Sequence, residues 1–358
     1  MRIIAVHLLN DYSGSPKVLM QALKAFTKNN METHLFTSGK RAGFLSTIPK
    51  VNNHFFTYYF SENKLIRICF YFFSQLILFF KLAFFLKKTD IVYVNTVLPF
   101  GASCAAKLKG CKVIYHIHET SIKPKILKSF LFNIVKGTAT EVIYVSEFLA
   151  NQEALNLKKN ILYNVLESSF IEIANKNNTL EKKEKIVLMI CSLKKYKGVD
   201  EFLQLAVMNP SFIFKLVVNA TQKEIDSYFN FQIVPQNLII YPTQKNTHTF
   251  YQEASILLNL SDVNLWVETF GLTILEGMAY KLPAIVPPVG GVIELVEENK
   301  NGFLIDSKNI VSISEKINLL FSNKELYEEM QFHAIEKSKV FSEAHFEESI
   351  LKIFSKYN

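Results

Sequence analysis

Short runs of β-branched and aromatic residues alternate with longer amphipathic stretches along the first half of this chain. The strand-like runs are residues 3–9, 33–36, 91–95, 112–117, 141–145 and 161–163. Parallel strands need long crossover connections, which are usually helices. The alternation therefore predicts a mostly parallel sheet with helices on its faces, an α/β domain of the Rossmann-like, doubly wound kind.

The alternation stops at a polar segment and then starts again. Residues 172–185 are rich in Lys, Glu and Asn, a composition typical of a linker. Strand-like runs follow at residues 186–190, 212–218, 238–240, 256–260, 284–286 and 303–305. The predicted organisation is a first domain over 1–170, a linker over 171–185, a second α/β domain over 186–340, and a helical segment over 341–358 that packs back on the first domain.

A length of 358 residues suits two such domains. Ligands of open α/β sheets bind at the carboxyl ends of the strands, so we expect the active site between the domains.

Composition and charge narrow the possible partners. Hydrophobic residues make up 49% of the chain and charged residues 20%, which argues against disorder. A formal charge of +8 suits phosphate-bearing ligands, anionic lipid or nucleic acid. Because the basic residues are scattered in ones and twos and form no basic stripe, we expect no nucleic-acid partner.

The cysteines and the first residues indicate a compartment. The four cysteines lie in apolar or strand-like surroundings without C-x-x-C spacing, and we expect buried free thiols: Cys69, Cys104, Cys111 and Cys191. Met1 leads directly into a strand-like run, which does not resemble a cleavable signal. Both features predict a reducing, cytoplasmic location.

Residues 65–86 form a long apolar segment with few polar positions. Its length approaches the ~20 residues that span a bilayer, but a Lys near the centre costs about 2.5–3.5 kcal/mol and the uncharged run 68–80 is too short. Two interpretations stay open. The helix is buried in the first domain, or its Phe-rich face also lies on an anionic membrane surface beside nearby lysines. That face contains Phe72, Phe73, Phe79, Phe80 and Phe84.

Two glutamates flank a predicted helix start in the second half. Glu268 precedes a helix expected over 272–280, and Glu276 lies inside it. Carboxylates accept hydrogen bonds from vicinal hydroxyls, so one glutamate suits a ribose and the other a sugar. N–H groups at the helix start suit a phosphate, and here they belong to Gly271, Leu272 and Thr273. Alternatively, Glu268 caps the helix and Glu276 faces solvent, although the apolar neighbours of Glu276 weigh against this.

The segment Glu268-Thr-Phe-Gly-Leu-Thr-Ile-Leu-Glu276-Gly-Met-Ala, followed by Leu-Pro-Ala-Ile-Val and by Gly290-Gly291, resembles the retaining glycosyltransferases of family 4. Weaker matches around His118 and Lys197 extend the resemblance over most of the chain. It implies the GT-B fold, in which two Rossmann-like domains face a cleft. It also implies transfer of a hexosyl group from a nucleotide-diphosphate sugar with retention of configuration.

The resemblance assigns roles to residues of the second domain. Glu276 would bind the donor ribose, and Lys197 the diphosphate. Glu268 would bind the hydroxyls of the transferred sugar and is a candidate catalytic residue. The backbone near the sugar and phosphates would be that of Phe270, Gly271, Leu272 and Thr273.

Family members usually carry an Arg four or five positions before this Lys, and Ser192 stands there instead. Lys194 or Lys195 restores the charge but not the planar fork of an Arg, or is a solvated charge beside a helix start.

In the first domain, Gly14 is the remaining glycine of a loop that is glycine-rich in the family, or part of a turn that starts a helix with Pro16 at its first position. His118 ends a predicted strand, and the resemblance makes it a contact of the donor sugar and a candidate catalytic residue. Glu119 is a weaker candidate, and His116 is expected to be structural.

The expected partners are a UDP-, GDP- or ADP-sugar donor and a glycan or lipid-linked acceptor, as in surface polysaccharide or lipopolysaccharide synthesis. We expect no metal or other cofactor, because the sequence contains no D-x-D triplet. The alternatives are a catalytically silent nucleotide-sugar-binding protein of the same fold, a sugar-nucleotide epimerase, or a phosphorylase, for which no cofactor lysine is identified. An NAD-dependent oxidoreductase is disfavoured because no G-x-G-x-x-G follows a predicted strand.

Overall fold

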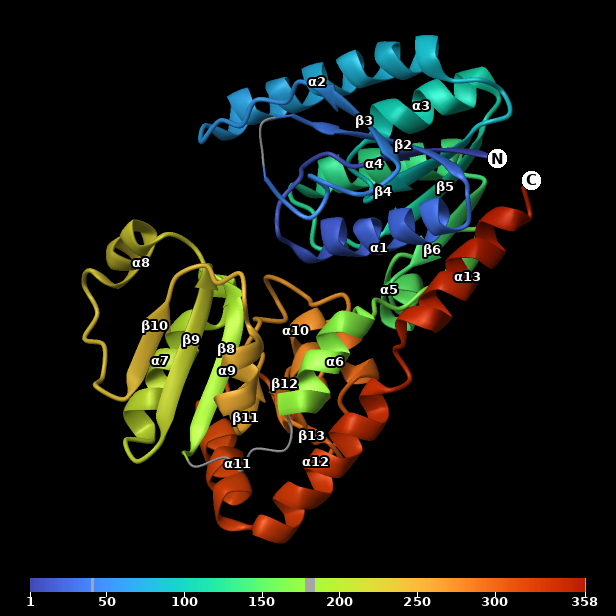
Figure 1. The fold of residues 1–358 in the computed structure, drawn as a ribbon. Coiled ribbons are helices and arrows are strands. Elements are labelled where there is room, and N and C mark those ends of the chain that lie inside the picture. Colours follow the sequence, from blue (N-terminus) through green and yellow to red (C-terminus); the bar gives the residue numbers. More distant parts are fainter. Residues whose placement is uncertain (40–41, 178–183, 358) are drawn as a thin grey trace. The chain divides into compact units, whose positions relative to one another are not determined.

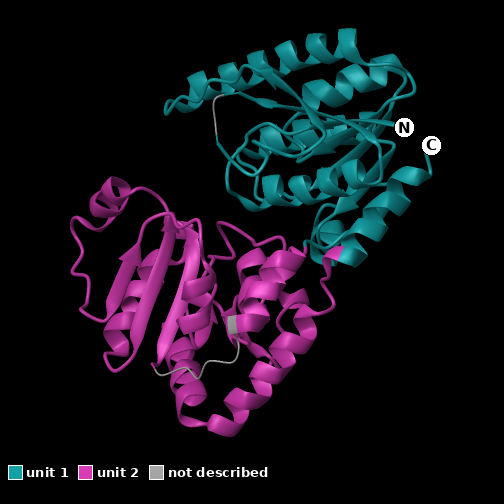
Figure 2. Ribbon diagram, in the orientation of Figure 1, with its two compact units in different colours: residues 1–164, 344–358 teal, residues 165–343 magenta. Residues whose placement is uncertain are grey.

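The computed structural model describes residues 1–39, 42–177 and 184–357, and the chain divides into two compact units (Figures 1 and 2). Unit 1 comprises residues 1–164 together with the chain from Ala344 onward, and unit 2 comprises residues 165–343. Each unit contains a parallel sheet with helices packed on it. The predicted α/β class with two Rossmann-like domains is confirmed.

Among the described residues, unit 1 has a seven-stranded parallel sheet of order β3-β2-β1-β4-β5-β6-β7. Its strands are β1 (Arg2–Val6), β2 (Glu32–Ser38), β3 (Val51–Phe56), β4 (Ile91–Asn95), β5 (Lys112–Ile117), β6 (Glu141–Tyr144) and β7 (Lys158–Ile161). The strand order reverses between β1 and β4, and doubly wound sheets bind ligands at such a point. The sequence missed β3, a polar edge strand, and placed β7 too late.

The helices of unit 1 are α1 (Gly14–Lys28), α2 (Lys64–Phe85), α3 (Phe100–Lys109), α4 (Lys125–Thr138), α5 (Glu147–Gln152) and α13 (Glu343–Ser355). α2 packs against α3, and α3 against α4. The chain returns to unit 1 through α13, where the ring of Phe354 lies 4.6 Å from Phe26 of α1 and 5.2 Å from Tyr93 of β4. These aromatic contacts hold the C-terminal helix in the core of unit 1.

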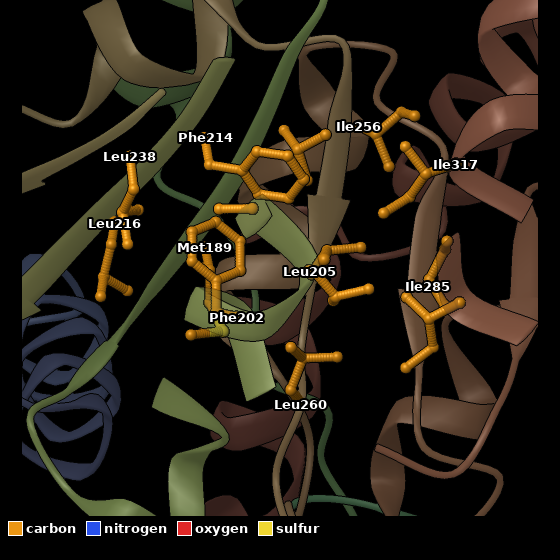
Figure 3. Packing of buried hydrophobic residues seen from close by; sticks show 14 of the residues in the cluster. Met189, Phe202, Leu205, Phe214, Leu216, Leu238, Ile256, Leu260, Ile285 and Ile317 are labelled. Atoms are coloured by element: carbon orange, nitrogen blue, oxygen red, sulfur yellow. The ribbon is translucent and has the colours of Figure 1, made fainter. Parts of the chain in front are cut away.

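Unit 2 has a six-stranded parallel sheet of order β10-β9-β8-β11-β12-β13 in the described residues. Its strands are β8 (Ile186–Ser192), β9 (Ile213–Asn219), β10 (Leu238–Tyr241), β11 (Ile256–Leu258), β12 (Ala284–Val286) and β13 (Gly302–Leu304). Its α-helices are α6 (Ser168–Asn177), α7 (Val199–Met208), α8 (Gln222–Phe229), α9 (His248–Glu253), α10 (Leu272–Ala279), α11 (Ile310–Ser322) and α12 (Lys324–Ser338). Figure 3 shows the core, where Phe202 of α7 packs edge-on against Phe214 of β9 at 5.3 Å.

The boundary between the units differs from the predicted one. It falls between Asn164 and Val165, and α6 occupies the first part of the predicted linker. The reason is aromatic packing, because Phe170 of α6 lies 4.3 Å from the ring of His248 and 6.0 Å from Tyr280. Residues 178–183 of the predicted linker lie outside the described residues.

The cysteines are free thiols but not all buried. Cys111 is buried, Cys104 and Cys191 are part-buried, and Cys69 is exposed. The prediction of four buried thiols is therefore wrong for Cys69, which lies on the outer side of α2.

Candidate active site

The start of α10 is shaped by glycines that allow close backbone approach. Gly271 precedes the helix with a φ of +103°, and Gly290 has a φ of +110°. A Cβ at Gly290 would lie 2.5 Å from the carbonyl oxygen of Glu268, and the N–H of Gly291 donates to that oxygen at 2.7 Å. Because side chains rarely adopt a positive φ, glycine is required here. The Gly290-Gly291 loop thus fixes the backbone that leads into the first turn of α10.

The first turn of α10 carries the residues that the sequence assigned to a phosphate. Phe270 is buried and its ring packs edge-on against Phe341 at 5.6 Å, so its side chain belongs to the core. Leu272 and Thr273 are partly exposed at the helix start. The N–H groups of a first helical turn have no intrahelical acceptor, and the helix dipole adds positive potential there. This turn is suited to bind an anion.

Lys197 and Glu268 form an ion pair beside this helix. Lys197 follows β8 in a short 3₁₀ turn (Lys195–Lys197), and its Nζ lies 2.7 Å from Oε2 of Glu268. The same ammonium lies 5.1 Å from the ring centre of Trp266, which stacks on Tyr196 at 5.3 Å. β8 and β11 are neighbours in the sheet, so residues distant in sequence meet at their ends. The pair is part-buried and positioned by an aromatic stack.

A backbone contact fixes the turn that carries Lys197. Gly198 has a φ of +78°, and a Cβ there would lie 2.2 Å from the carbonyl oxygen of Leu260. The N–H of Asp262 donates to the carbonyl of Tyr196 at 2.9 Å. The loop after β11 and the turn after β8 are therefore joined tightly.

Cys191 lies near this ion pair at the end of β8. Burial raises the pKa of its thiol to about 12; Lys197 lowers that pKa slightly and Glu268 raises it. The thiol is protonated at neutral pH, and it is the thiolate that acts as a nucleophile. Cys191 is consequently not a candidate nucleophile.

Glu276 is only 9% exposed, and the hydroxyl of Tyr251 donates to its Oε2 at 2.7 Å. Burial and the Glu276 carboxylate raise the pKa of Tyr251, so this hydroxyl stays protonated and donates. Tyr251 stacks on Tyr280 at 5.8 Å. The alternative in which Glu276 faces solvent is wrong. Glu268 does not cap α10 either, since Gly271 is the N-cap residue and no side chain caps it.

A pocket of about 280 Å³ opens at the ends of β8 and β9. Its lining residues are Leu193, Lys194, Asn219, Ala220, Glu224, Ser227 and Tyr228. The structure therefore places Lys194 in a pocket wall, whereas Lys197 pairs with Glu268. Lys195 is highly exposed and lies 3.8 Å from Asp200, a pair that contributes little to stability.

Unit 1 has its own polar cluster at the carboxyl ends of β1, β4 and β5. Nε2 of His118 donates to Oδ1 of Asn95 at 2.9 Å. The amide nitrogen of Asn95 donates to Nδ1 of His7 and to the carbonyl of Ser15, each at 3.0 Å. Asn95 thus links His118 to the first turn of α1, where Gly14 is the first residue. Pro16 is the third residue of α1, not the first as expected.

Burial keeps this cluster neutral. It lowers the pKa of His118 well below its ordinary value, and His116 and His7 add to the effect. Burial also lowers the pKa of His7 to about 4 and that of His116 to about 3. The Tyr93 hydroxyl lies 2.6 Å from Nδ1 of His116, which is a core residue.

Glu119 is the acidic member of the cluster. Burial raises its pKa to about 7, although the N–H groups of His118 and Val97 each donate to its Oε2 at 3.3 Å. Its protonation therefore changes near neutral pH.

Known proteins match both units. Residues 170–337 match the family model of glycosyl transferases group 1, and residues 12–154 match that of glycosyltransferase family 4. The chain is a group 1 glycosyltransferase. It is a transferase of EC class 2.4, and these matches do not favour a silent binding protein or an epimerase.

An uncharacterized glycosyltransferase of Methanocaldococcus jannaschii is 28% identical over 264 residues, 71% of each chain. The N-acetyl-alpha-D-glucosaminyl L-malate synthase of Bacillus anthracis is 23% identical over 68% of each chain. The crystal structure of Anabaena HepE in complex with UDP-glucose superposes with a TM-score of 0.79 at 16% identity, covering 99% of this chain and 100% of that one. The structural match identifies the fold of this glycosyltransferase as GT-B.

The structure brings together some of the predicted site residues and adds others to them. In this glycosyltransferase Lys197 and Glu268 meet beside α10, and Glu276 lies within the same helix. Sequence reasoning missed Tyr251, Trp266 and Asn95. The position of Asn95 at the end of a predicted strand next to that of His118 was the available signal; a Tyr inside a short helix gave none.

Proposed function

We propose that this glycosyltransferase moves a hexosyl group from a UDP-sugar to a glycan or lipid-linked acceptor, with retention of configuration, in the synthesis of a surface polysaccharide or lipopolysaccharide. The observation that carries the donor part is the Lys197–Glu268 pair beside the first turn of α10, with Glu276 buried in that helix. HepE, which shares the fold, was crystallised with UDP-glucose.

Each group of unit 2 has a task in this proposal. The N–H groups at the start of α10 and the ammonium of Lys197 bind the diphosphate. Glu276 accepts hydrogen bonds from the ribose hydroxyls, and Tyr251 holds its carboxylate in place. Glu268 accepts from the hydroxyls of the transferred sugar, and its ion pair with Lys197 holds the carboxylate in position.

Departure of the diphosphate builds negative charge on its oxygens. Fixed donors that meet this charge lower the barrier, and removing one such donor costs roughly 10²–10³ in rate. Lys197 supplies a cation at this point, so we propose that the reaction needs no metal ion. Activity that persists in EDTA is the expected result, and loss of activity restored by Mg²⁺ or Mn²⁺ contradicts it.

Retention follows without a covalent intermediate in this proposal. Cys191 is protonated, and Glu268 is engaged by Lys197. The acceptor hydroxyl would then attack C1 of the sugar on the face from which the diphosphate leaves. Its oxygen bonds to C1 as the bond from C1 to the phosphate oxygen breaks, and its proton passes to the departing diphosphate. His118, a neutral imidazole held by Asn95, contributes to the transfer step as a hydrogen-bonding group.

Nucleotide binding tests the donor site directly. A ligand at 100 times its dissociation constant stabilises a protein by about 2.7 kcal/mol, so UDP should raise the melting temperature more than GDP or ADP does. Glu276→Ala should weaken UDP binding, whereas Glu268→Ala should keep UDP binding and lose turnover with the sugar donor. Absence of a shift with all three nucleotides, or negligible effects of both substitutions, contradicts the proposal.

We also propose a cytoplasmic location. The free thiols of Cys69, Cys104 and Cys111 suit a reducing compartment. Fractionation of cells that express the full chain tests this, and recovery of the protein outside the cytoplasmic and inner-membrane fractions contradicts it.

A further inference from the structure

Helix α2 presents many large apolar residues outward. Its buried positions include polar ones, namely Ser74 and Gln75 beside Tyr71, Leu78 and Leu82. The exposed apolar residues, called here the α2 face, are Leu65, Ile66, Phe70, Phe72, Phe73, Leu76, Phe80 and Phe84. Helices of water-exposed domains usually show the opposite arrangement, with polar residues outside. Leu65 and Phe84, near the two ends, are 76% and 88% exposed.

Polar contacts hold the inner side of α2 in unit 1. The side-chain oxygen of Gln75 accepts from the N–H of Gly101 at 3.1 Å, and the hydroxyl of Tyr71 donates to the carbonyl of Leu98 at 2.6 Å. A Cβ at Gly101 would lie 2.1 Å from the carbonyl oxygen of Gln75, so the two helices touch at backbone level. Of the described helices, α2 is long and apolar enough to cross a membrane. Crossing would break these contacts and leave polar groups in lipid.

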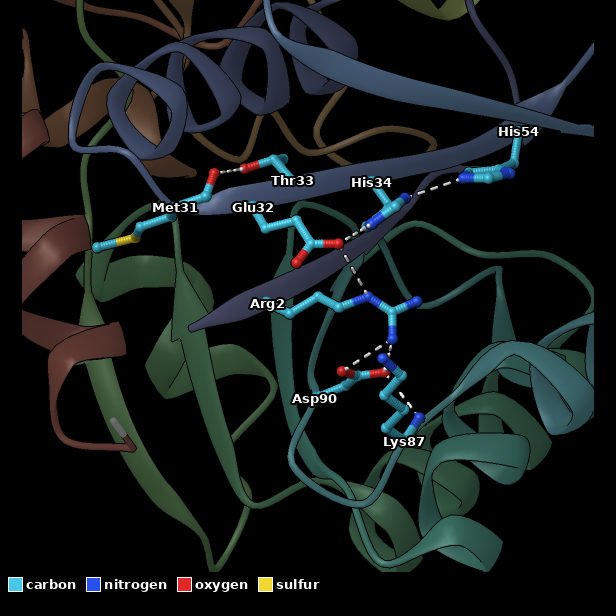
Figure 4. Close-up of polar contacts among 8 residues, drawn as sticks. All are labelled: Arg2, Met31, Glu32, Thr33, His34, His54, Lys87 and Asp90. Atoms are coloured by element: carbon cyan, nitrogen blue, oxygen red, sulfur yellow. Dashed lines mark hydrogen bonds and ion pairs between the residues drawn. The ribbon is translucent and has the colours of Figure 1, made fainter.

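The carboxyl end of α2 is anchored as well. The ring of Phe85 packs 5.2 Å from Phe36 and 4.9 Å from His54, and the Arg2 guanidinium lies 4.5 Å above it. Figure 4 shows the polar network behind this contact, in which Arg2 pairs with Asp90 at 3.2 Å. The α2 face is thus presented by a helix fixed at its middle and at its end.

The apolar surface continues onto α4. Phe72 lies 5.6 Å from Phe130 of α4, and one turn earlier Ile126 is 83% exposed. On the other side, the exposed ring of Tyr59 lies 5.9 Å from Phe70. The surface is therefore wider than one helix.

The sequence around this surface is strongly basic. Between residues 64 and 140, a stretch bordered by the exposed Glu62 and by the buried Glu141, the acidic residues are Asp90, which is buried against Arg2, and Glu119 in the polar cluster. The same segment has twelve basic residues: Lys64, Arg67, Lys81, Lys87, Lys88, Lys107, Lys109, Lys112, Lys123, Lys125, Lys128 and Lys136. The whole chain has 40 basic and 32 acidic residues, so the excess of basic over acidic residues is much larger in this segment than in the chain as a whole.

We propose that the α2 face and the start of α4 dock on the surface of an anionic bilayer. Exposed aromatic rings enter the headgroup region, and the lysines lie beside acidic lipid headgroups. A second copy of the chain would bring the same positive charges to the contact, which argues against self-association. The proposal does not depend on the donor site, although it would bring the enzyme to a lipid-linked acceptor.

Co-sedimentation of the full-length protein with vesicles tests this. We expect binding to vesicles that contain phosphatidylglycerol, weak binding to phosphatidylcholine alone, and a loss at high salt. Phe80→Glu and Phe84→Glu should each reduce the bound fraction strongly, and Lys125→Glu should reduce partitioning by about fivefold or more. Phe231→Glu in unit 2 is the matched control, because Phe231 is 96% exposed and should not matter.

If a Phe variant melts at a lower temperature than the wild type, Leu65→Glu at the other end of α2 serves as a second variant for the same vesicle-binding test. UDP-induced stabilisation measured without vesicles should be unchanged in all these variants, which separates this proposal from the donor site. Equal sedimentation of the wild type, the α2 variants and Phe231→Glu overturns the proposal. The proposal is also overturned if the protein does not bind vesicles and the α2 face instead forms a dimer that Phe84→Glu disrupts, or binds another protein.

Discussion

The two units carry different chemistry at the carboxyl ends of their strands. In unit 2 the groups are charged: Lys197 faces Glu268 at 2.7 Å. In unit 1 the two histidines of the cluster are neutral, because burial keeps His118 and His7 unprotonated, and Asn95 joins them by amide hydrogen bonds. Both sheets are parallel and doubly wound, so the fold does not set this difference. The side chains at the strand ends set it, and they suit a diphosphate in unit 2 and uncharged hydroxyls in unit 1.

Removing the Lys197 ammonium from unit 2 should have the largest effect on sugar transfer. Lys197→Ala leaves Glu268 part-buried without this partner and removes a charge that meets the diphosphate. We expect transfer to fall by roughly 10²–10³-fold, measured as UDP release from UDP-sugar with acceptor. Lys195→Ala is the matched control in the same 3₁₀ turn. Lys195 is solvent-exposed, and its contact with Asp200 at 3.8 Å contributes little to stability. Similar losses in both variants would show that charge in this turn, not the ion pair, matters.

Substitution of the buried Tyr251 in unit 2 should have the next largest effect. Tyr251→Phe removes the 2.7 Å hydrogen bond to Glu276 and keeps the ring stack on Tyr280. A hydrogen bond to a charged group contributes about 1.5–3 kcal/mol, so UDP affinity measured by calorimetry should fall about tenfold or more. Tyr327→Phe is the control, since that hydroxyl donates to the carbonyl of Ser255. Unchanged UDP affinity in Tyr251→Phe would remove Glu276 from the nucleotide site.

Substitution of Asn95 tests whether unit 1 contributes to sugar transfer and not to nucleotide binding. Asn95→Ala removes the acceptor for Nε2 of His118 and frees the imidazole to rotate. We expect turnover to fall about tenfold, which is less than the roughly 10²–10⁴-fold contribution of a positioned acid or base because His118 itself is retained, while UDP affinity stays unchanged. Asn95→Asp keeps an acceptor for Nε2 of His118 but loses the donors to His7 and Ser15, so it should restore only part of the turnover. A loss of UDP affinity equal to the loss of turnover would contradict the division between the units.

Much of the unit 2 site was predictable because its residues lie in one continuous segment. Gly271, Glu268 and Glu276 belong to a single strand-end loop and helix, so sequence spacing determines their geometry. Lys197 came from the family resemblance and not from spacing, because its pairing with Glu268 depends on β8 and β11 being neighbours.

The helix α2 and the unit 1 cluster were less predictable. Composition predicted a helix close to Lys64–Phe85, but not that Ser74 and Gln75 would face inward. That orientation depends on a glycine, Gly101, at the contact with α3. The residues His7, Asn95 and His118 come from three strands that are distant in sequence, so their contacts depend on the strand order of the sheet and not on the spacing within one segment.

Glu119 gives the smallest expected effect and tests the neutral character of unit 1 through pH. Its pKa is about 7 in the folded protein against an ordinary value of 4.5. The folded state therefore binds this proton more tightly, and its contribution to stability is full below pH 4.5 and lost as pH rises to 7. Glu119→Gln removes the titration. We expect the free energy of unfolding of the variant relative to the wild type to rise by roughly 1–3 kcal/mol between pH 5 and 8.

The histidines act with the opposite sign and cancel in this difference. The pKa values of His7 and His116 are lowered to about 4 and 3, so the unfolded chain binds more protons below pH 6.5. Their contribution to stability is lost as pH falls through that range, in the variant and the wild type alike. Urea unfolding of both proteins across this pH range isolates Glu119. A flat difference would mean that Glu119 is ionised in the folded protein, and that the strand ends of unit 1 carry charge as those of unit 2 do.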